Sequence, residues 1–358
     1  MTREHADGDG GTAQPGPAQT RPCAGQLSAA PSYAAIDLGT NNCRMLIAAP
    51  SGDGFRVVDS YSRMVRLGEG LHHTGQLCGA GMDRALLALQ ACADRLARRD
   101  IRRVRAVATE ACRRAANGTE FLARAKRETG IDICTISSRE EAELALESCA
   151  PLLARHGRRA LLFDIGGGST ELAWVRLTAG RPELIGYHSL PVGVVTLAER
   201  WGDAGFTEDG FDAMVDDVAT RLADFEKVHC IGREIRNGEV LLLGTSGTVT
   251  TLAGIVLNLD RYRRLAVDGV ALSRQEADAA LHSLRDMGPE ELARHPCVGP
   301  DRVEFVLPGC AVFAAITRFW PAPEVIVADR GLREGMLLRM IRNDRERTPG
   351  RRMSQARS

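Results

Sequence analysis

Apolar residues recur along this chain in two spacings, one typical of buried strands and the other of helices. Short apolar runs that end in glycine or polar residues predict strands at 34–38, 43–49, 55–65, 104–108, 131–137, 183–190, 240–243 and 324–328, together with a hairpin over 161–175. Apolar positions three or four residues apart predict helices at 80–99, 118–129, 138–153, 207–228, 248–257, 274–286, 289–294, 302–320 and 329–341. Because both kinds of element alternate along the chain, we expect an α/β fold.

The two ends of the chain lack these spacings. Residues 1–32 contain a glycine run, scattered proline and many small or polar residues, which predicts a disordered leader rather than a secretory signal. The chain from Arg342 onward is rich in arginine and serine, so we expect 343–358 to be a flexible tail. No stretch approaches the ~20 apolar residues that a membrane span needs.

The hairpin at 161–175 carries the most distinctive polar residues of the chain. Its first strand ends in an aspartate, and the turn consists of small residues and ends at a glutamate: Asp164, Gly166, Gly167, Gly168, Ser169, Thr170 and Glu171. Three consecutive glycines let the backbone turn its N–H groups toward an anion, and a carboxylate beside that anion is suited to hold Mg²⁺. A tight hairpin with a capping aspartate would contain the same residues.

A second Asp-x-Gly hairpin lies near the start of the chain. Its turn has the same layout of an aspartate followed by small polar residues: Asp37, Gly39, Thr40, Asn41 and Asn42. Two such hairpins suggest two similar halves that face each other across a cleft, and together they favour phosphate binding over a purely structural role.

A third loop of small residues leads into the helix at 248–257. It consists of Gly244, Thr245, Ser246, Gly247 and Thr248. The free N–H groups of a first helical turn attract anions, so this loop is another candidate phosphate site.

The charge balance indicates a local anion site rather than a charged surface. The formal net charge of the 358 residues is zero, which argues against nucleic acid or a membrane surface as a partner, and the length favours two domains. Only Lys126 and Lys227 are lysines, so nearly every cation is an arginine, whose planar fork suits phosphate. The 10 cysteines have no metal-binding spacing, and we interpret them as small buried residues in a reducing cytoplasm.

Two further segments carry charged residues whose role the pattern leaves open. Arg113 or Arg114 follows the strand at 104–108, at the edge where an open α/β sheet binds ligands, but a solvated arginine on the next helix fits equally well. Glu140 and Glu141 begin the helix at 138–153, where the helix dipole favours carboxylates and a preceding serine can cap the helix, so capping alone explains them.

Taken together, these segments resemble the Ppx/GppA phosphatases, the family of exopolyphosphatases and guanosine pentaphosphate phosphohydrolases. The resemblance extends from about residue 33 to residue 341 and rests on AAIDLGTNNCRM, AVATEACR, ISSREEA, LLFDIGGGSTEL, LLLGTSGTVTTLAGI and VADRGLREGM. It implies the short form of the family, with two ribonuclease H-like domains of the actin, sugar kinase and heat-shock ATPase superfamily and a cleft between them. Domain I would comprise 33–139 and 333–342, and domain II would comprise 140–332.

The same resemblance implies roles for individual residues. Glu141 would be the base that orients and deprotonates the attacking water, and Arg113 would clamp a phosphoryl group. Asp37 and Asp164 would hold Mg²⁺, with Mn²⁺ as the second candidate, and Glu171 would lie near the metal-bound water. These roles require the two aspartates to meet across the cleft.

These roles predict a cytoplasmic, Mg²⁺-dependent exopolyphosphatase, in which water attacks the terminal phosphoryl group of linear polyphosphate and releases orthophosphate. Hydrolysis of guanosine pentaphosphate (pppGpp) at the same site is the alternative. An ATP-dependent kinase or chaperone-like ATPase of the same superfamily, and a sensor that closes on polyphosphate or an alarmone without cleaving it, are further hypotheses. The resemblance also implies a homodimer.

Overall fold

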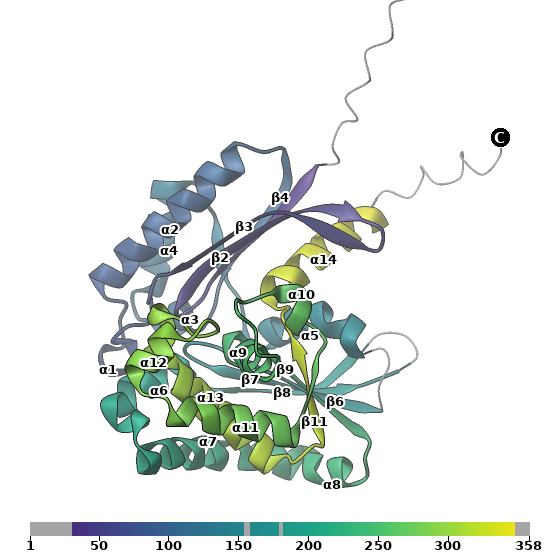
Figure 1. The fold of residues 1–358 in the computed structure, drawn as a ribbon. Helices are drawn as coiled ribbons and strands as arrows, with labels where there is room; N and C mark the ends of the chain where they lie inside the picture. Colours follow the sequence, from purple (N-terminus) through teal and green to yellow (C-terminus); the bar gives the residue numbers. More distant parts are fainter. Residues whose placement is uncertain (1–30, 154–157, 179–181, 348–358) are drawn as a thin grey trace, which may run out of the picture. The chain divides into compact units, whose positions relative to one another are not determined.

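The computed structural model describes residues 31–153, 158–178 and 182–347. From Pro31 onward the chain falls in one compact unit, whose described strands form two sheets. The first sheet contains β1 (Ser32–Leu38), β2 (Asn42–Ser51), β3 (Gly54–Met64), β4 (Ile101–Ala108) and β5 (Ile133–Thr135). The second contains β6 (Arg159–Ile165), β7 (Thr170–Arg176), β8 (Glu183–Leu190), β9 (Val240–Thr245), β10 (Ala271–Ser273) and β11 (Glu324–Ala328). Both sheets are visible in Figure 1.

The two sheets repeat one topology. In the first, the strand order is β3-β2-β1-β4-β5, with an antiparallel meander on one side of β1 and parallel strands on the other. In the second, β8-β7-β6-β9-β11 has the same order and directions around β6, and β10 is added at the edge. This repetition confirms the expected pair of ribonuclease H-like sheets, each built around an Asp-x-Gly hairpin.

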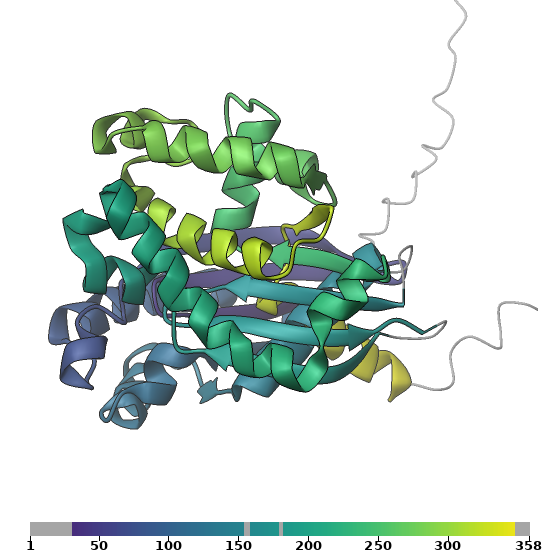
Figure 2. The ribbon, with the colours of Figure 1, turned by 90° about the horizontal axis from the view of Figure 1, so that it is seen from below.

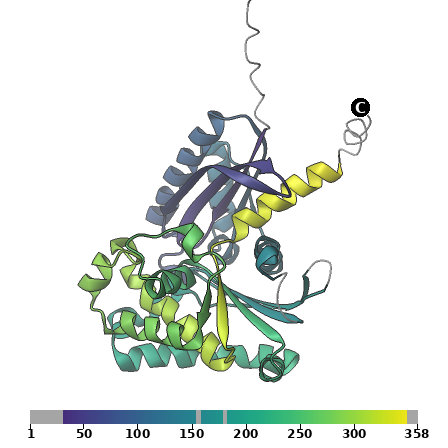
Figure 3. The same cartoon turned by 45° about the vertical axis from the view of Figure 1, so that its right-hand side comes forward.

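The alternation of side chains along a strand decides which helices cover which face of the first sheet. Ala34, Ile36 and Leu38 of β1 pack with residues of α2 (Gly79–Ala97) and α4 (Gly118–Thr129). Tyr33 and Ala35 point to the other face and pack with α14 (Leu332–Glu346), which runs along this sheet in Figure 3.

The second sheet is covered in the same way. Leu161 and Phe163 of β6 lie in a large cluster with helices α6 (Val194–Trp201), α7 (Glu208–His229), α8 (Ile231–Arg236), α9 (Gly247–Val256), α11 (Arg274–Asp286), α12 (Pro289–Arg294) and α13 (Val303–Phe319), several of which are seen in Figure 2. Ala160 and Leu162 pack on α5 (Ser138–Leu153), whose Leu144 packs in turn with the first sheet and α14. Helices α5 and α14 therefore connect the inner faces of the two sheets.

The contact between α5 and α14 is close enough to require glycine. A Cβ at Gly335 of α14 would lie 2.1 Å from the carbonyl oxygen of Leu144 in α5. Ion pairs lock the same helices together, because Arg339 and Arg342 of α14 both bond the carboxylate of Glu147 in α5. The two helices thus approach at backbone distance.

The helices and strands predicted from sequence are present, with changes at their ends. The strand expected at 131–137 is reduced to β5, and the chain also forms short helices α1 (Leu71–Thr74), α3 (Glu110–Arg114) and α10 (Arg264–Val267) and the 3₁₀ turns Gly202–Phe206 and Pro300–Arg302. Residues 1–30 of the predicted leader lie outside the described residues, and Ser32 already belongs to β1. In the described part of the chain, no helix has the length and hydropathy needed to cross a bilayer.

The prediction of a flexible tail from residue 343 was wrong for its first residues, because α14 continues to Glu346. Asp344 is only 6% exposed and accepts a hydrogen bond from the Tyr33 hydroxyl at 2.9 Å. Arg102 and Arg103 of β4 also pair with its carboxylate, at 2.7 and 3.0 Å. Residues distant in sequence therefore hold this arginine-rich segment in a helix, while 348–358 lie outside the described residues.

The cysteine prediction was only partly right. Cys43, Cys92, Cys112, Cys149, Cys297 and Cys310 are buried as expected. Cys134 and Cys230 are exposed.

Candidate active site

The two predicted metal-binding aspartates occupy equivalent positions in the two sheets. Asp37 is the last residue but one of β1, and Asp164 is the last residue but one of β6. By strand alternation each points to the inner face, the one that α5 and α14 connect. Their partners across the hairpins differ, because Asp37 is paired with Arg44 and Asp164 with Glu171.

Four of the predicted acidic residues lie close enough for their charges to interact. Burial raises the pKa of Asp164 to about 7, and the nearby carboxylates of Glu171 and Asp37 contribute to the shift while Arg44 opposes it. The pKa of Glu141 is raised well above its ordinary value by burial and by Glu171, with smaller contributions from Asp37 and Asp164. Burial also raises the pKa of Asp37. Charge interactions therefore link Asp37 and Asp164 to each other and to Glu141.

Glu171 is fixed by one hydroxyl group from the glycine turn and one from β8. Its Oε1 accepts hydrogen bonds from Ser169 Oγ at 2.6 Å and from Ser189 Oγ at 3.0 Å, and the residue is 3% exposed. Burial raises the pKa of Glu171, although these two hydrogen bonds and Arg113 act against the shift. The Ser169 hydroxyl, a predicted phosphate ligand, thus donates to a carboxylate of the site.

Glu141 lies at the start of α5, as predicted, and contacts Arg113. Ser137 caps the helix by accepting the N–H of Glu140 at 3.1 Å, while Glu141 Oε2 lies 3.3 Å from Arg113 Nη1. Arg113 Nη1 also donates to the carbonyl oxygen of Ile136 at 2.8 Å. Of the two arginines that the sequence left open, the one that joins the site is Arg113.

The two Asp-x-Gly turns are in direct contact. A Cβ at Gly168 would lie 2.7 Å from Thr40 Oγ1, and one at Gly167 would lie 3.1 Å from Thr40 Cβ and 3.2 Å from the backbone nitrogen of Asn41. Within each turn the first glycine N–H closes the hairpin, from Gly39 to the carbonyl of Asn42 and from Gly166 to that of Ser169, both at 2.9 Å. The glycines permit this approach of one turn to the other.

Two of the predicted phosphate-binding residues in these turns, Thr170 and Asn41, have buried side chains. Thr170 is fully buried and donates its hydroxyl to the carbonyl oxygen of Val192 at 2.7 Å. Asn41 is 8% exposed, and its side-chain oxygen has no hydrogen-bond partner among the described residues. Asn42 begins β2 beside the turn.

The third loop forms the beginning of α9. Ser246 has a φ of 138°, which side-chain-bearing residues rarely adopt, and its hydroxyl accepts the N–H groups of Thr248 and Val249. Thr245 donates to the carbonyl oxygen of Arg330, and a Cβ at Gly244 would lie 2.5 Å from the Phe163 ring. Gly247 lies next to a cation, since its Cβ position is 3.3 Å from Arg302 Nη1.

Three further arginines, Arg44, Arg302 and Arg333, lie near the first Asp-x-Gly turn or the loop before α9. Burial lowers the pKa of Arg302 and of Arg333, and the charge of Arg44 lowers both further. Arg44 and Arg333 in turn act on the pKa of Asp37. The hairpin register could have revealed Arg44, which lies opposite Asp37, whereas no local signal marks Arg302 or Arg333.

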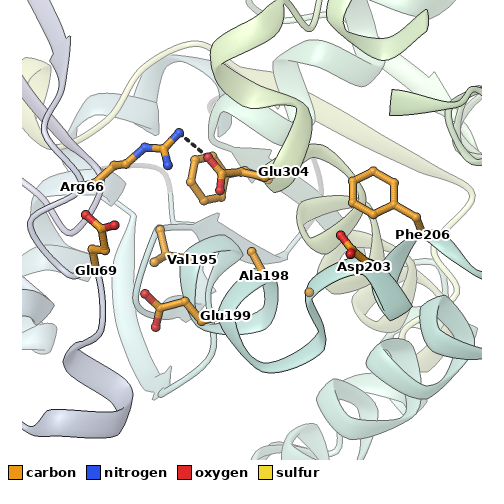
Figure 4. Close-up of a pocket in the computed structure, with 10 residues that line it drawn as sticks. Arg66, Glu69, Val195, Ala198, Glu199, Asp203, Phe206 and Glu304 are labelled. Atoms are coloured by element: carbon orange, nitrogen blue, oxygen red, sulfur yellow. Dashed lines mark ion pairs between the residues drawn. The ribbon is translucent and has the colours of Figure 1, made fainter. Parts of the chain in front are cut away.

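A cavity of about 260 Å³ lies beside the two turns (Figure 4), since the N–H groups of its lining residues Arg66 and Val195 bond the carbonyl oxygens of Asn41 and Gly167. It is lined by Arg66, Glu69, Val195, Ala198, Glu199, Gly202, Asp203, Phe206, Glu304 and Phe305. Arg66 pairs with Glu304, and the N–H of Gly70 donates to Glu199 Oε1 at 2.7 Å. None of the predicted site residues lines this cavity, so the cavity itself is not the candidate active site.

The donor atoms of the site suit a hard divalent cation. Mg²⁺ is usually held by one or two carboxylates together with waters and substrate phosphates, which matches Asp37 and Asp164. The raised pKa values of Asp37 and Asp164 fit this assignment, because these buried acids have too little positive charge nearby to stabilise their ionised forms, and a bound cation would supply it. Among residues 31–153, 158–178 and 182–347, no group of three or more His, Cys, Asp or Glu residues forms a metal cage.

Comparisons with known proteins agree with this architecture. Residues 46–344 match the model of the Ppx/GppA phosphatase family. The structure of an exopolyphosphatase-like protein has a TM-score of 0.77 at 27% identity, over 87% of this chain and 98% of that chain. The Aquifex aeolicus member of the Ppx/GppA family has a TM-score of 0.71 at 28% identity, over 88% and 98% of the two chains.

An exopolyphosphatase from Cytophaga hutchinsonii shares the fold, with a TM-score of 0.78 at 24% identity over 87% of this chain and 98% of that one. The family match begins within β2, so it excludes β1 and Asp37 and includes Arg113, Glu141 and the whole second sheet. This chain belongs to the Ppx/GppA phosphatase family.

Proposed function

We propose that this protein is a Mg²⁺-dependent exopolyphosphatase, which hydrolyses the terminal phosphoanhydride bond of linear polyphosphate and releases orthophosphate. The observation that carries the proposal is the gathering of Asp37, Asp164, Glu141 and Glu171 in one site with Arg113. Phosphoryl transfer to water needs no covalent intermediate with the protein. Charged groups that stabilise the phosphoryl oxygens and a carboxylate that orients the attacking water are sufficient to catalyse it. The likeness to an exopolyphosphatase-like protein supports polyphosphate as the substrate.

In this proposal Glu141 is the general base. The oxygen of a water attacks the terminal phosphorus, the bond from phosphorus to the bridging oxygen breaks, and Glu141 accepts the proton of the water. A carboxylate acts best as a base when its pKa lies near the working pH, and burial beside other acids raises the pKa of Glu141 in that direction. Arg113, 3.3 Å from Glu141, contributes a cation for the phosphoryl oxygens.

Asp37 and Asp164 would hold Mg²⁺, which when bound would neutralise charge on the phosphate oxygens. The N–H groups of the glycine turns and of the loop before α9 would bind phosphate oxygens. Arg44, Arg302 and Arg333 would supply the positive charge for the remaining phosphates of the chain, because the charge of Arg44 acts on the pKa of both other arginines and Arg333 also interacts with Asp37.

Phosphate release decides between substrates. We expect orthophosphate from polyphosphates of defined length in the presence of Mg²⁺ and none after chelation with EDTA. A protein that cleaves pppGpp alone would instead be the guanosine pentaphosphate phosphohydrolase, a function that the family name also covers. Release from ATP without an acceptor would support the ATPase hypothesis, and binding without release would support a sensor.

The substitution Glu141→Gln tests the base directly. It keeps the shape of the side chain but cannot accept the proton, so phosphate release is expected to fall by ~10²-fold or more. Glu143→Gln on the same helix is the matched control, since its carboxylate is 38% exposed and pairs with Arg139. Equal activity of Glu141→Gln and wild type would contradict the assignment.

A further inference from the structure

The residue that controls the geometry of Arg113 is a glutamate one turn earlier in α3. Glu110 Oε2 accepts hydrogen bonds from Arg113 Nε at 3.1 Å and from Nη2 at 2.6 Å. With Nη1 bonded to the carbonyl oxygen of Ile136 at 2.8 Å, the guanidinium is held at both of its ends. In this orientation its Nη1 lies 3.3 Å from Glu141 Oε2. We propose that Glu110 is a positioning residue, which sets the orientation of Arg113 in the reaction described above and therefore rests on that proposed function.

The surroundings of Glu110 leave its side chain little freedom. It is 9% exposed, and α3 begins where the N–H of Thr109 bonds the carbonyl oxygen of Leu38 at 3.3 Å, at the end of β1. From the other sheet, the Gly168 turn packs over it, since a Cβ at Gly168 would lie 3.2 Å from Glu110 Cγ. A side chain confined by both sheets can hold its partner in one orientation.

The charges around Glu110 also single out Arg113 as its partner. The other cation in reach, Arg114, lies 3.7 Å from Oε1 and has a side chain that is 38% exposed, which makes a weak ion pair. Arg113 is shared between Glu110 at 2.6 Å and Glu141 at 3.3 Å. Without Glu110, Nε and Nη2 would lose their acceptor, and the guanidinium would be free to turn away from the orientation in which Nη1 faces Glu141.

The first test separates positioning from folding by kinetics. Glu110→Gln removes the charge and is expected to lower kcat for polyphosphate by about 10- to 100-fold, the size of a small misplacement, with a much smaller change in KM. Glu110→Asp, which keeps the charge on a shorter side chain, should recover part of the loss. Glu120→Gln on α4, an exposed glutamate, and Arg114→Ala are the controls and should retain wild-type kcat.

A double-mutant cycle then asks whether Glu110 acts through Arg113. We expect Glu110→Gln to cause no further loss of kcat in an Arg113→Ala background. The same fold loss in both backgrounds, or an unchanged kcat in Glu110→Gln with wild-type Arg113, would overturn the inference.

A spectroscopic readout keeps the inference testable without any activity. The Nε–H of Arg113, assigned by loss of its NMR signal in Arg113→Lys, should exchange slowly with solvent in the wild type and in Glu120→Gln, and rapidly in Glu110→Gln. If wild-type protein releases no phosphate from any substrate, the proposed function fails and this signal alone decides: slow exchange that depends on Glu110 supports the positioning, and slow exchange that persists without Glu110 overturns it.

Discussion

At the scale of single residues, the site places acids where burial and like charges disfavour their ionised forms. Asp164 is the clearest case, because its pKa is raised from 3.8 to about 7. The Asp164 carboxylate therefore lowers the stability of the metal-free protein at neutral pH. Folding moves its charge from water into a site where burial and nearby carboxylates disfavour it. Function and stability therefore oppose each other at this position.

We expect Asp164→Asn to make the metal-free protein more stable while it abolishes phosphate release. At pH 8 the free energy of unfolding should rise by on the order of 1 kcal/mol or more, since one pKa unit corresponds to about 1.4 kcal/mol. Urea denaturation after treatment with EDTA measures this. Asp132→Asn, whose side chain is 68% exposed, is the control, and a less stable Asp164→Asn protein would refute the crowding of charge.

Sequence predicted these acids because they lie inside recognisable turns, and it missed residues whose importance depends on distant neighbours. Asp37 and Asp164 end apolar strands before glycine turns, a local pattern. Arg302 reaches the site only because α13 and α9 pack on the same sheet, and nothing in its own neighbourhood of the chain indicates that. Glu110 was not singled out either, because its contact with Arg113 depends on a short helix that the sequence did not predict.

At the scale of elements, α5 and α14 couple the two sheets through a crossing that only glycine permits. Gly335→Ala would place a methyl group 2.1 Å from the backbone of Leu144, where no side chain can move aside. We expect a loss of roughly 1–3 kcal/mol of stability, the usual cost of overpacking, even though alanine favours helices. Gly79→Ala in α2, with nothing within 4 Å of its Cβ position, is the matched control and should not destabilise. Thermal unfolding of both variants measures the difference.

The end of α14 depends on one buried carboxylate. Asp344→Ala would remove the partner of Tyr33, Arg102 and Arg103, so we expect a loss of about 1–3 kcal/mol, the cost of a buried polar group that loses its partner. Asp53→Ala, at an exposed turn, should change stability by less than about 0.5 kcal/mol. Equal stability of the two variants would show that α14 needs no such anchor.

The elements themselves were largely predictable, because strands bounded by glycine and helices with regular apolar spacing are local features. The hairpin at the centre of each sheet follows from the repeated Asp-x-Gly motif, whereas the positions of the parallel strands beside it come from pairing between distant segments. What sequence could not give was the helical state of residues 343–346, since it comes from contacts with β1 and β4 and not from the arginine-rich segment itself.

At the scale of the whole molecule, the crowded acids give the metal-free protein an unusual dependence of stability on pH. The folded state retains protons on carboxyl groups that the unfolded chain has released, so the free energy of unfolding falls as pH rises toward and through 7. Burial lowers the pKa of His188 and His229, and these residues oppose folding only below their ordinary pKa of 6.5.

Between about pH 6.5 and about pH 8, the change in stability with pH therefore comes from the carboxyl groups and not from these two histidines. Across this window we expect the metal-free protein to lose on the order of 1 kcal/mol of stability. Saturating Mg²⁺ should remove most of this slope by replacing the retained protons. Denaturation curves at several pH values, with Mg²⁺ and with EDTA, measure the effect, and a stability that rises across this window in EDTA would be the contrary result.

The pairing of Asp37 with Arg44 in one hairpin, and of Asp164 with Glu171 in the other, breaks the symmetry of two otherwise repeated halves. In the proposed reaction a polyanion would meet a cation beside Asp37 and a second carboxylate beside Asp164. The two turns would therefore not be interchangeable, and this asymmetry would give a bound polymer one preferred direction.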